Sequence, residues 1–206
     1  MTRKKLKHFA QMKEWSHVLE PTSSECGDLK GTWGDRVILE LACGKGAYTL
    51  ALAERDLEAT VVGVDIKGSR MWHGAGEALE MENVKFLRTR IEDLGEYFGE
   101  GEVDEIWITF PDPHPRKGKA KKRLTGPRFL EIYRRVLKPG GKLHLKTDDE
   151  ALFRWSLEVL EEEGWKLERV VEDVYKVDDE VLHIKTDYEK RWIEEGRTIR
   201  YLEARV

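Results

Sequence analysis

Glycines and acids follow two apolar segments of this chain in a pattern that can bind a nucleoside cofactor. Glu40, Gly44 and Gly46 lie where the run 36–41 gives way to a helix-like segment. Glycine lets the backbone pass close to a ligand, and the first N–H groups of a helix are free to bind one. Asp65 ends the next apolar segment about 20 residues later, where a carboxylate can hold a ribose diol. The alternatives are a purely structural turn and an Asp65 that only caps the helix after it.

The first turn favours S-adenosylmethionine over a nicotinamide dinucleotide. It carries Ala42, Gly44 and Gly46 and lacks the Gly-x-Gly-x-x-Gly pattern that cradles a pyrophosphate. Glu40 stands inside the same motif, where a carboxylate would repel a pyrophosphate but attract the cationic methionine portion. The pattern therefore predicts S-adenosylmethionine as the cofactor and argues against an NAD-dependent oxidoreductase.

A proline-rich loop follows the fourth apolar segment and holds an acid at its centre. Pro111, Pro113 and Pro115 flank Asp112 and His114 and stiffen the loop. Ligands of an open parallel sheet bind beyond the carboxyl ends of its strands, so we expect Asp112 to face the cofactor. The alternative is a rigid turn with a solvent-facing acid. His114 could be catalytic, but a spacer on the loop is the stronger hypothesis.

Basic residues gather in two parts of the chain although its net charge is −4. Residues 1–13 are rich in lysine, and residues 116–128 contain no acid. Local cationic density matters more for phosphate binding than the sum over the whole chain. The second segment predicts contacts with nucleic-acid phosphates, with a solvated charged face as the alternative. Its cations are Arg116, Lys117, Lys119, Lys121, Lys122, Arg123 and Arg128.

Three separated motifs resemble those of the tRNA (guanine-N7-)-methyltransferase family. The loop 112–125 is similar to the family's Asp-Pro-Trp-Pro and the Lys/Arg-rich stretch after it, which ends Arg-Leu-Thr. Thr147 and Asp148 match a Thr-Asp pair after the fifth strand, and residues 186–189 match Thr-x-Tyr-Glu near the C-terminus. The resemblance covers residues 36–206 in order. It implies a methyltransferase that acts on N7 of a guanine in tRNA, in the variable loop.

The resemblance also implies a role for each matching residue. The acid between the cofactor and the target base would be the catalytic residue, Asp112. The expected cofactor-binding residues are Glu40, Ala42, Gly44, Gly46, Asp65, Arg90, Ile91 and Asp112. The expected substrate-binding residues are Arg116, Asp148, Thr186, Tyr188 and Glu189. The expected contacts to the RNA backbone are Lys117, Lys119, Lys121, Lys122 and Arg123.

The chain departs from the family pattern at several positions. His114 replaces a tryptophan, and Lys119 replaces a histidine of the basic stretch. Ala42 replaces a glycine of the first loop. Arg90 stands where the family has an acid or amide beside the adenine. We therefore expect the protein to contact the cofactor there through its backbone or through Glu92.

N7 of guanine carries a lone pair and no proton, so its methylation requires no general base. We expect acceleration from placing this nitrogen in line with the methyl group, and an electrostatic role for Asp112 as the base becomes positively charged. Asp148 and Glu189 are expected to accept hydrogen bonds from the N–H edge of guanine, which adenine cannot offer. The base has to leave its stack to reach such a pocket.

Strand-like and helix-like segments alternate along the chain and must position these residues. The alternation predicts an α/β, Rossmann-like class I methyltransferase: a mostly parallel seven-stranded sheet with helices on both faces and an antiparallel C-terminal edge. We expect a basic leader over 1–35, with a short helix and a turn-rich stretch over 21–34, and a single methyltransferase domain over 36–206. Residues 138–142 predict a tight turn, because proline ends a helix and glycine permits positive φ. The expected strands are 36–41, 59–64, 84–87, 105–110, 142–146, 166–175 and 198–205, and the expected helices are 47–55, 68–81, 91–98, 127–137 and 150–163.

Composition limits the remaining possibilities. With 206 residues, 40% of them hydrophobic and 37% charged, the chain suits one globular domain. No apolar run is long enough to cross a bilayer, and none follows the basic N-terminus as in a secretory signal. Cys26 and Cys43 have no spacing typical of a zinc site or a disulfide framework, so no metal and a reduced cytoplasm are expected.

Two other functions and the oligomeric state stay open at this point. A non-catalytic RNA-binding module on a methyltransferase fold would not need the cofactor motif, which is present. A methyltransferase acting on a small molecule or a protein would not need the basic segment 116–128. The chain could act as a monomer or a homodimer.

Overall fold

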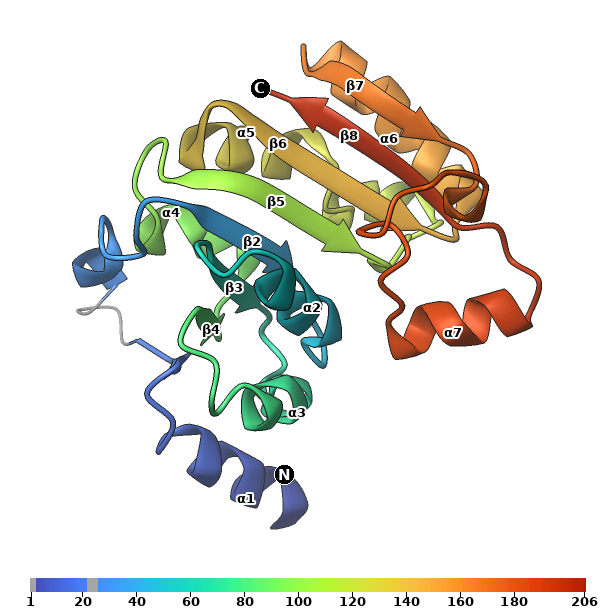
Figure 1. Ribbon diagram of the computed structural model, residues 1–206. Coiled ribbons are helices and arrows are strands. Elements are labelled where there is room, and N and C mark those ends of the chain that lie inside the picture. Colours follow the sequence, from blue (N-terminus) through green and yellow to red (C-terminus); the bar gives the residue numbers. More distant parts are fainter. Residues whose placement is uncertain (1–2, 22–25) are drawn as a thin grey trace.

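The computed structural model describes residues 3–21 and 26–206, and one mixed sheet runs through it (Figure 1). The strands lie in the order β1-β4-β3-β2-β5-β6-β8-β7. All neighbouring pairs are parallel except β6–β8 and β8–β7, which form the antiparallel C-terminal edge. Their bounds are β1 Val18–Leu19, β2 Val37–Leu41, β3 Thr60–Val64, β4 Val84–Leu87, β5 Val103–Thr109, β6 Leu137–Thr147, β7 Lys166–Val171 and β8 Arg200–Arg205.

Helices cover both faces of the sheet because the central strands are apolar on both sides. In β2, Leu39 and Leu41 pack in one core cluster and Ile38 in the other, as the alternation of side chains in a strand requires. Helices α4, α5 and α6 contribute to the first cluster, and α2 and α3 contribute to the second (Figure 1). Their bounds are α1 Arg3–Met12, α2 Ala47–Arg55, α3 Gly68–Glu77, α4 Leu94–Tyr97, α5 Pro127–Val136, α6 Glu150–Glu162 and α7 Asp187–Glu194.

The Rossmann-like class and the antiparallel edge are confirmed, but the expected number of strands is wrong. The sheet has eight strands, not seven, because β1 in the basic leader pairs in parallel with β4. The short helix expected in the leader is α1, which packs against α3 with His8 stacked on Trp72 at 3.9 Å between ring centroids. Within the turn-rich stretch, residues 22–25 lie outside the described residues.

Several further elements differ from the expectation. The strand expected over 166–175 ends at Val171, and the helix expected over 91–98 is the 3-10 turn Ile91–Asp93 followed by α4. The tight turn expected at 138–142 is instead a bulge inside β6, whose pairing with β5 jumps from Leu137 to Lys142. Gly140 adopts φ +75° in this bulge, and glycine is the residue that adopts a positive φ without strain, as expected for this segment. Helix α7 was not expected at all, and it lies beside the carboxyl ends of the central strands (Figure 1). None of the helices in the described part of the chain is long and apolar enough to cross a membrane.

Candidate active site

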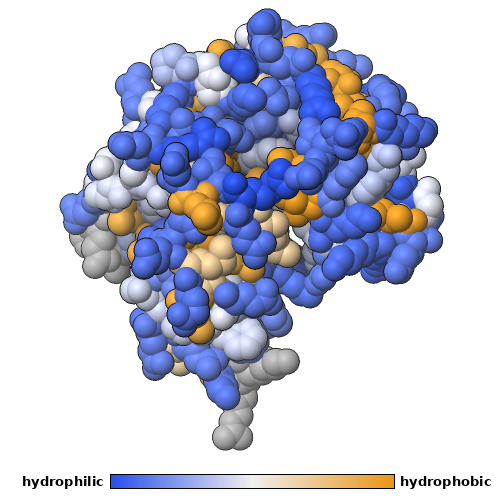
Figure 2. All heavy atoms as spheres, in the orientation of Figure 1, coloured by the Kyte–Doolittle hydropathy of each residue, from blue (hydrophilic) through white to orange (hydrophobic). Residues whose placement is uncertain are grey.

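A cleft opens at the carboxyl ends of the parallel strands, where the topology predicts a ligand. It consists of two cavities of about 370 Å³ each, which share the wall formed by Ala42, Lys67, Arg70 and the residues 110–112. Most of the molecular face in Figure 2 is hydrophilic, with apolar side chains confined to a few patches. The first cavity is bounded by α2 and α7, and the second by the loops after β3 and β4.

The glycine turn after β2 adopts a left-handed backbone. Gly44 and Gly46 have φ of +59° and +79°, and Ala42 has φ +58°, a conformation that favours glycine. A Cβ on Gly46 would lie 2.7 Å from the ring of Phe86, so this glycine is required by packing. A Cβ on Gly44 would meet no protein atom closer than 3.9 Å, because Gly44 borders the open cavity.

Asp65 links the two loops that shape the cofactor half of the cleft. One carboxylate oxygen accepts the backbone N–H of Gly44 at 3.0 Å, and the other accepts that of Lys67 at 2.8 Å. Its side chain also lines the second cavity. The two interpretations of Asp65, a helix-start acceptor and a cleft residue, are therefore compatible.

Glu40 is a buried acid at the floor of the first cavity. It is 1% exposed, and its two oxygens accept hydrogen bonds from the hydroxyls of Thr49 and Thr109, the latter at 2.8 Å. Burial raises the pKa of Glu40 to about 7, although both threonine hydrogen bonds oppose the rise. The backbone N–H of Thr49 also donates to this carboxyl group, so most of its acceptor positions are used within the protein.

The second cavity is lined by apolar residues and by charged residues of both signs. Arg90 and Ile91 follow β4 and line it, as do Ile66, Glu92 and Thr89. Among the residues that the structure describes, no acid pairs with Arg90, whereas Glu92 lies 3.7 Å from the guanidinium of Arg128. The cavity therefore offers backbone and apolar surface to a planar ring, which fits the expected adenine contact at 90–92.

The loop after β5 holds Asp112 at the junction of the two cavities. Asp112 is exposed, lines both cavities, and has no partner among the described side chains. Phe110 and His114 adopt φ of +48° and +44°, which non-glycine residues rarely do. Arg123 braces the loop by donating to the carbonyls of Pro113 at 3.1 Å and His114 at 3.3 Å. His114 thus helps shape the loop through its main chain.

Arg123, an expected contact to the RNA backbone, is engaged within the protein: two of its five guanidinium N–H groups donate to the loop carbonyls, and the group lies over the ring of Trp155 at 4.4 Å. The other four expected RNA contacts lie in the exposed 3-10 turn Lys117–Lys122, and no acid of the described residues pairs with them. Arg116 is exposed at the start of this turn, and Lys122 borders the second cavity.

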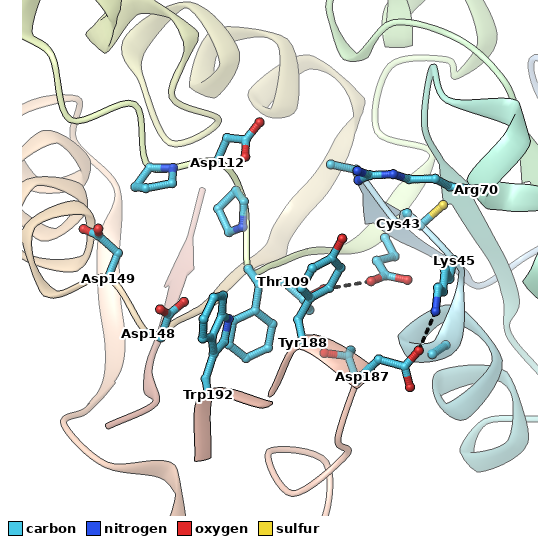
Figure 3. A pocket seen from close by; sticks show the side chains of 18 of the residues that line it. Cys43, Lys45, Arg70, Thr109, Asp112, Asp148, Asp149, Asp187, Tyr188 and Trp192 are labelled. Atoms are coloured by element: carbon cyan, nitrogen blue, oxygen red, sulfur yellow. Dashed lines mark hydrogen bonds and ion pairs between the residues drawn. The ribbon is translucent and has the colours of Figure 1, made fainter. Parts of the chain in front are cut away.

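An acidic and aromatic wall closes the far side of the first cavity (Figure 3). Asp148 follows β6 and is paired with Arg197 at 2.7 Å. The guanidinium of Arg197 lies 3.9 Å from the ring centroid of Trp192, and Tyr188 lines the same cavity. Thr186 caps α7 by accepting the backbone N–H of Glu189. Trp192 and Arg197 were missed, although Trp192 stands one helical turn after Tyr188.

Glu189 was expected to contact the target guanine, and the structure contradicts this. The side chain is fully buried and does not line the cleft. Its oxygens are taken by the ammonium of Lys146 at 2.8 Å and by the hydroxyl of Tyr175 at 2.6 Å. No oxygen of Glu189 is directed into the cavity where a base could reach it.

Fold and cleft together are those of class I S-adenosylmethionine-dependent methyltransferases, and solved structures agree on the fold. The 16S rRNA methyltransferase KamB superposes with a TM-score of 0.68 at 19% identity, covering 91% of this chain and 95% of that one. A 16S rRNA (adenine(1408)-N(1))-methyltransferase from Catenulisporales acidiphilia, solved with its cosubstrate S-adenosylmethionine, gives 0.63 at 19% identity, covering 91% and 92%.

Sequence comparison shows the family directly. Residues 35–202 match the family model described as a putative methyltransferase. A tRNA (guanine-N(7)-)-methyltransferase of Bacteroides thetaiotaomicron is 42% identical over 100% of this chain and 87% of its own. One from Christiangramia forsetii is 39% identical over 100% and 99%. The chain belongs to the tRNA (guanine-N(7)-)-methyltransferase family, which confirms the resemblance seen in its motifs.

Proposed function

We propose that this chain transfers a methyl group from S-adenosylmethionine to N7 of a guanine in tRNA. The observation that carries the proposal is the position of Asp112, an unpaired acid between a nucleoside-sized cavity and an acidic, aromatic one. The family membership supports the substrate and the acceptor atom. The basic turn beside the cleft supports a nucleic-acid substrate over a small molecule or a protein.

The residues at the carboxyl ends of β2, β3 and β4 fit S-adenosylmethionine, which supplies a methyl group on a positively charged sulfur. Glu40 provides a buried carboxyl group at the cavity floor for a cationic methionine portion. Asp65 lines the neighbouring cavity, where a ribose would lie, and Gly44 leaves space beside it. Ile91 and the backbone at Arg90 offer the surface for adenine.

The far side of the cleft suits an unstacked purine. Tyr188 and Trp192 present aromatic rings on which a base can stack. The ion pair with Arg197 uses Oδ2 of Asp148, and Oδ1 can accept a hydrogen bond from the N–H edge of guanine, which adenine does not offer. Asp112 stabilises the positive charge that develops on the ring. No residue has to remove a proton, because N7 carries none.

The remaining parts of the proposal concern the setting of the reaction. Lys117, Lys119, Lys121 and Lys122 bind tRNA phosphates, with Arg116 nearer the base. The target guanine lies in the variable loop, and the enzyme acts in the cytoplasm. Residues 36–206 form one catalytic domain, to which the leader adds a helix and an edge strand.

The test is a transfer assay with labelled cofactor and unmodified tRNA, followed by digestion and identification of the labelled nucleoside. We expect 7-methylguanosine as the product. Small ribosomal subunits serve as the competing substrate, because the solved structures of similar fold are 16S rRNA methyltransferases. Label in 1-methyladenosine, or in rRNA alone, would contradict the proposal.

A further inference from the structure

The ammonium group of Lys146 is buried at the end of β6 and ties down the segment that leads into α7. It is 0% exposed and donates to the carbonyl oxygens of Leu182 at 2.6 Å and Ile184 at 2.9 Å. Its third partner is the carboxylate of Glu189 at 2.8 Å. An ammonium group has three donors, so all of them are used within this cluster. Burial lowers the pKa of Lys146, and the neighbouring Glu189 opposes this.

Glu189 is the residue of α7 whose side chain is buried in the protein interior. Within this fully described helix it is the single buried residue. An isolated helix of eight residues is unstable in water, so α7 depends on its tertiary contacts. Tyr188 and Ile193 are 48% and 36% exposed, and Trp192 is partly buried against the second core cluster. The fully buried anchor of α7 is therefore a charge.

The exposed side of α7 forms part of the cleft. Tyr188 and Trp192 line the first cavity, with Thr186 and Asp187 beside them. In Figure 3 the ring of Trp192 lies beside Asp148, and the ring of Tyr188 lies beside Thr109. Asp148 follows Lys146 by two residues at the end of β6. The same short segment therefore carries Asp148, which lines the first cavity, and Lys146, which binds Glu189 of α7.

We propose that the buried Lys146–Glu189 ion pair positions α7 as the wall of the acceptor pocket, and that Glu189 is a positioning residue that does not touch the base. This inference rests on the proposed function for the identity of the acceptor. A carboxylate that left this cluster to reach a base would strand a buried ammonium group, which is strongly unfavourable. The pair acts together with Trp192, which packs on the core, and with the exposed Lys45–Asp187 ion pair to hold this mostly exposed helix in place.

The experiment compares Lys146→Met, Glu189→Gln and the double variant in the full-length chain. Each single change leaves one buried charge without its counter-charge, whereas the double change removes both charges. We expect KM for tRNA to rise about 10-fold or more in each single variant and to recover partly in the double variant, since coupled partners are not additive. Binding of S-adenosylhomocysteine should change much less than KM for tRNA, because the cavity proposed for its nucleoside part contains no residue of α7.

A second measurement does not depend on the substrate. Amide hydrogen exchange over 186–194 should be faster in each single variant than in the wild type and slower again in the double variant. Arg154→Met is the matched control, because it breaks the exposed Arg154–Glu172 pair away from the cleft and should alter neither exchange over 186–194 nor KM.

The outcomes separate the two proposals. Loss of activity in Glu189→Gln with no recovery in the double variant, together with unchanged KM in Lys146→Met, would show that Glu189 acts on the base and would overturn the positioning role. Unchanged exchange over 186–194 in both single variants would overturn it as well. A wild type that fails to methylate tRNA would refute the proposed function, while the exchange data would still decide whether the ion pair holds α7.

Discussion

Glu40 gives a prediction in which stability and cofactor binding change in opposite directions. The pKa of this carboxyl group is raised by burial from 4.5 to about 7. The folded protein without cofactor therefore binds a proton at Glu40 more tightly than the unfolded chain does. The contribution of this group to the free energy of unfolding is greatest below pH 4.5 and is lost as the pH rises through 7.

The magnitude follows from the pKa difference. The rise of the pKa from 4.5 to about 7 corresponds to a change of about 3 kcal/mol in the free energy of unfolding between pH values below 4.5 and pH values above 7. Glu40→Gln keeps the shape of the side chain and has no charge to bury; its amide oxygen can accept from Thr49 while its NH2 donates to the hydroxyl of Thr109. We expect the variant to be more stable than the wild type at pH 8 by up to about 3 kcal/mol, with the difference disappearing near pH 5.

Cofactor binding should show the opposite preference. A cationic methionine portion requires Glu40 as the carboxylate, whose fraction falls about 10-fold for each pH unit below its pKa. Wild-type affinity for S-adenosylmethionine should therefore fall about 10-fold between pH 8 and pH 6. In Glu40→Gln the affinity should be lower at pH 8, and what pH dependence is left should belong to the cofactor itself.

Two assays decide this. Urea denaturation without cofactor at pH 5 and pH 8 gives the stability difference, and calorimetry in buffers of different ionisation enthalpy gives the protons released on binding. Proton release near pH 6.5 should be present in the wild type and absent in Glu40→Gln. Equal stabilities at both pH values, or identical proton release by the two proteins, would refute the reasoning.

Three further predictions concern the loop acid, the first turn and the basic turn. Asp112→Asn should lower the single-turnover rate by about 10²–10³ with little change in tRNA affinity, and a near-normal rate would leave Asp112 as a loop-shaping residue. Ala42→Gly should raise the free energy of unfolding by up to about 1 kcal/mol in thermal or urea denaturation, because Ala42 has φ +58°; a decrease would mean that the methyl group packs usefully. Replacing Lys119, Lys121 and Lys122 with alanine should weaken tRNA binding and reduce its salt dependence by roughly 0.7–0.9 per lost phosphate contact, without affecting cofactor affinity. An unaltered salt slope would exclude these lysines from the RNA interface.

Local sequence patterns predicted the elements that the apolar core holds in place. Strand β4 and helix α2 have the expected bounds, because apolar residues and turn signals coincide there. Strand β1 has only two residues, too few for a recognisable alternation, and it forms because the edge of β4 accepts it. Helix α7 packs only Trp192 against the core, and its fully buried anchor is the charge of Glu189, which meets its partner only in the folded chain.

Site residues were predictable where their position in the motif fixes their surroundings. Asp65 and Asp112 lie at strand ends, so the topology brings them to the cleft. Residue type alone could not decide the fate of Arg123 or Glu189, because a charged side chain can face solvent, a ligand or an internal partner. Their partners lie 9 to 43 positions away in the sequence, a relation that only the folded chain reveals.

The central claim is that N7 of guanine is the atom that receives the methyl group. A tRNA transcribed with 7-deazaguanosine in place of every guanosine has a carbon at that position and cannot accept a methyl group through a nitrogen lone pair. Single-turnover transfer should occur with the ordinary transcript and be absent with the 7-deaza transcript, which should still inhibit competitively. Methyl transfer to the 7-deaza transcript at a comparable rate would contradict the account.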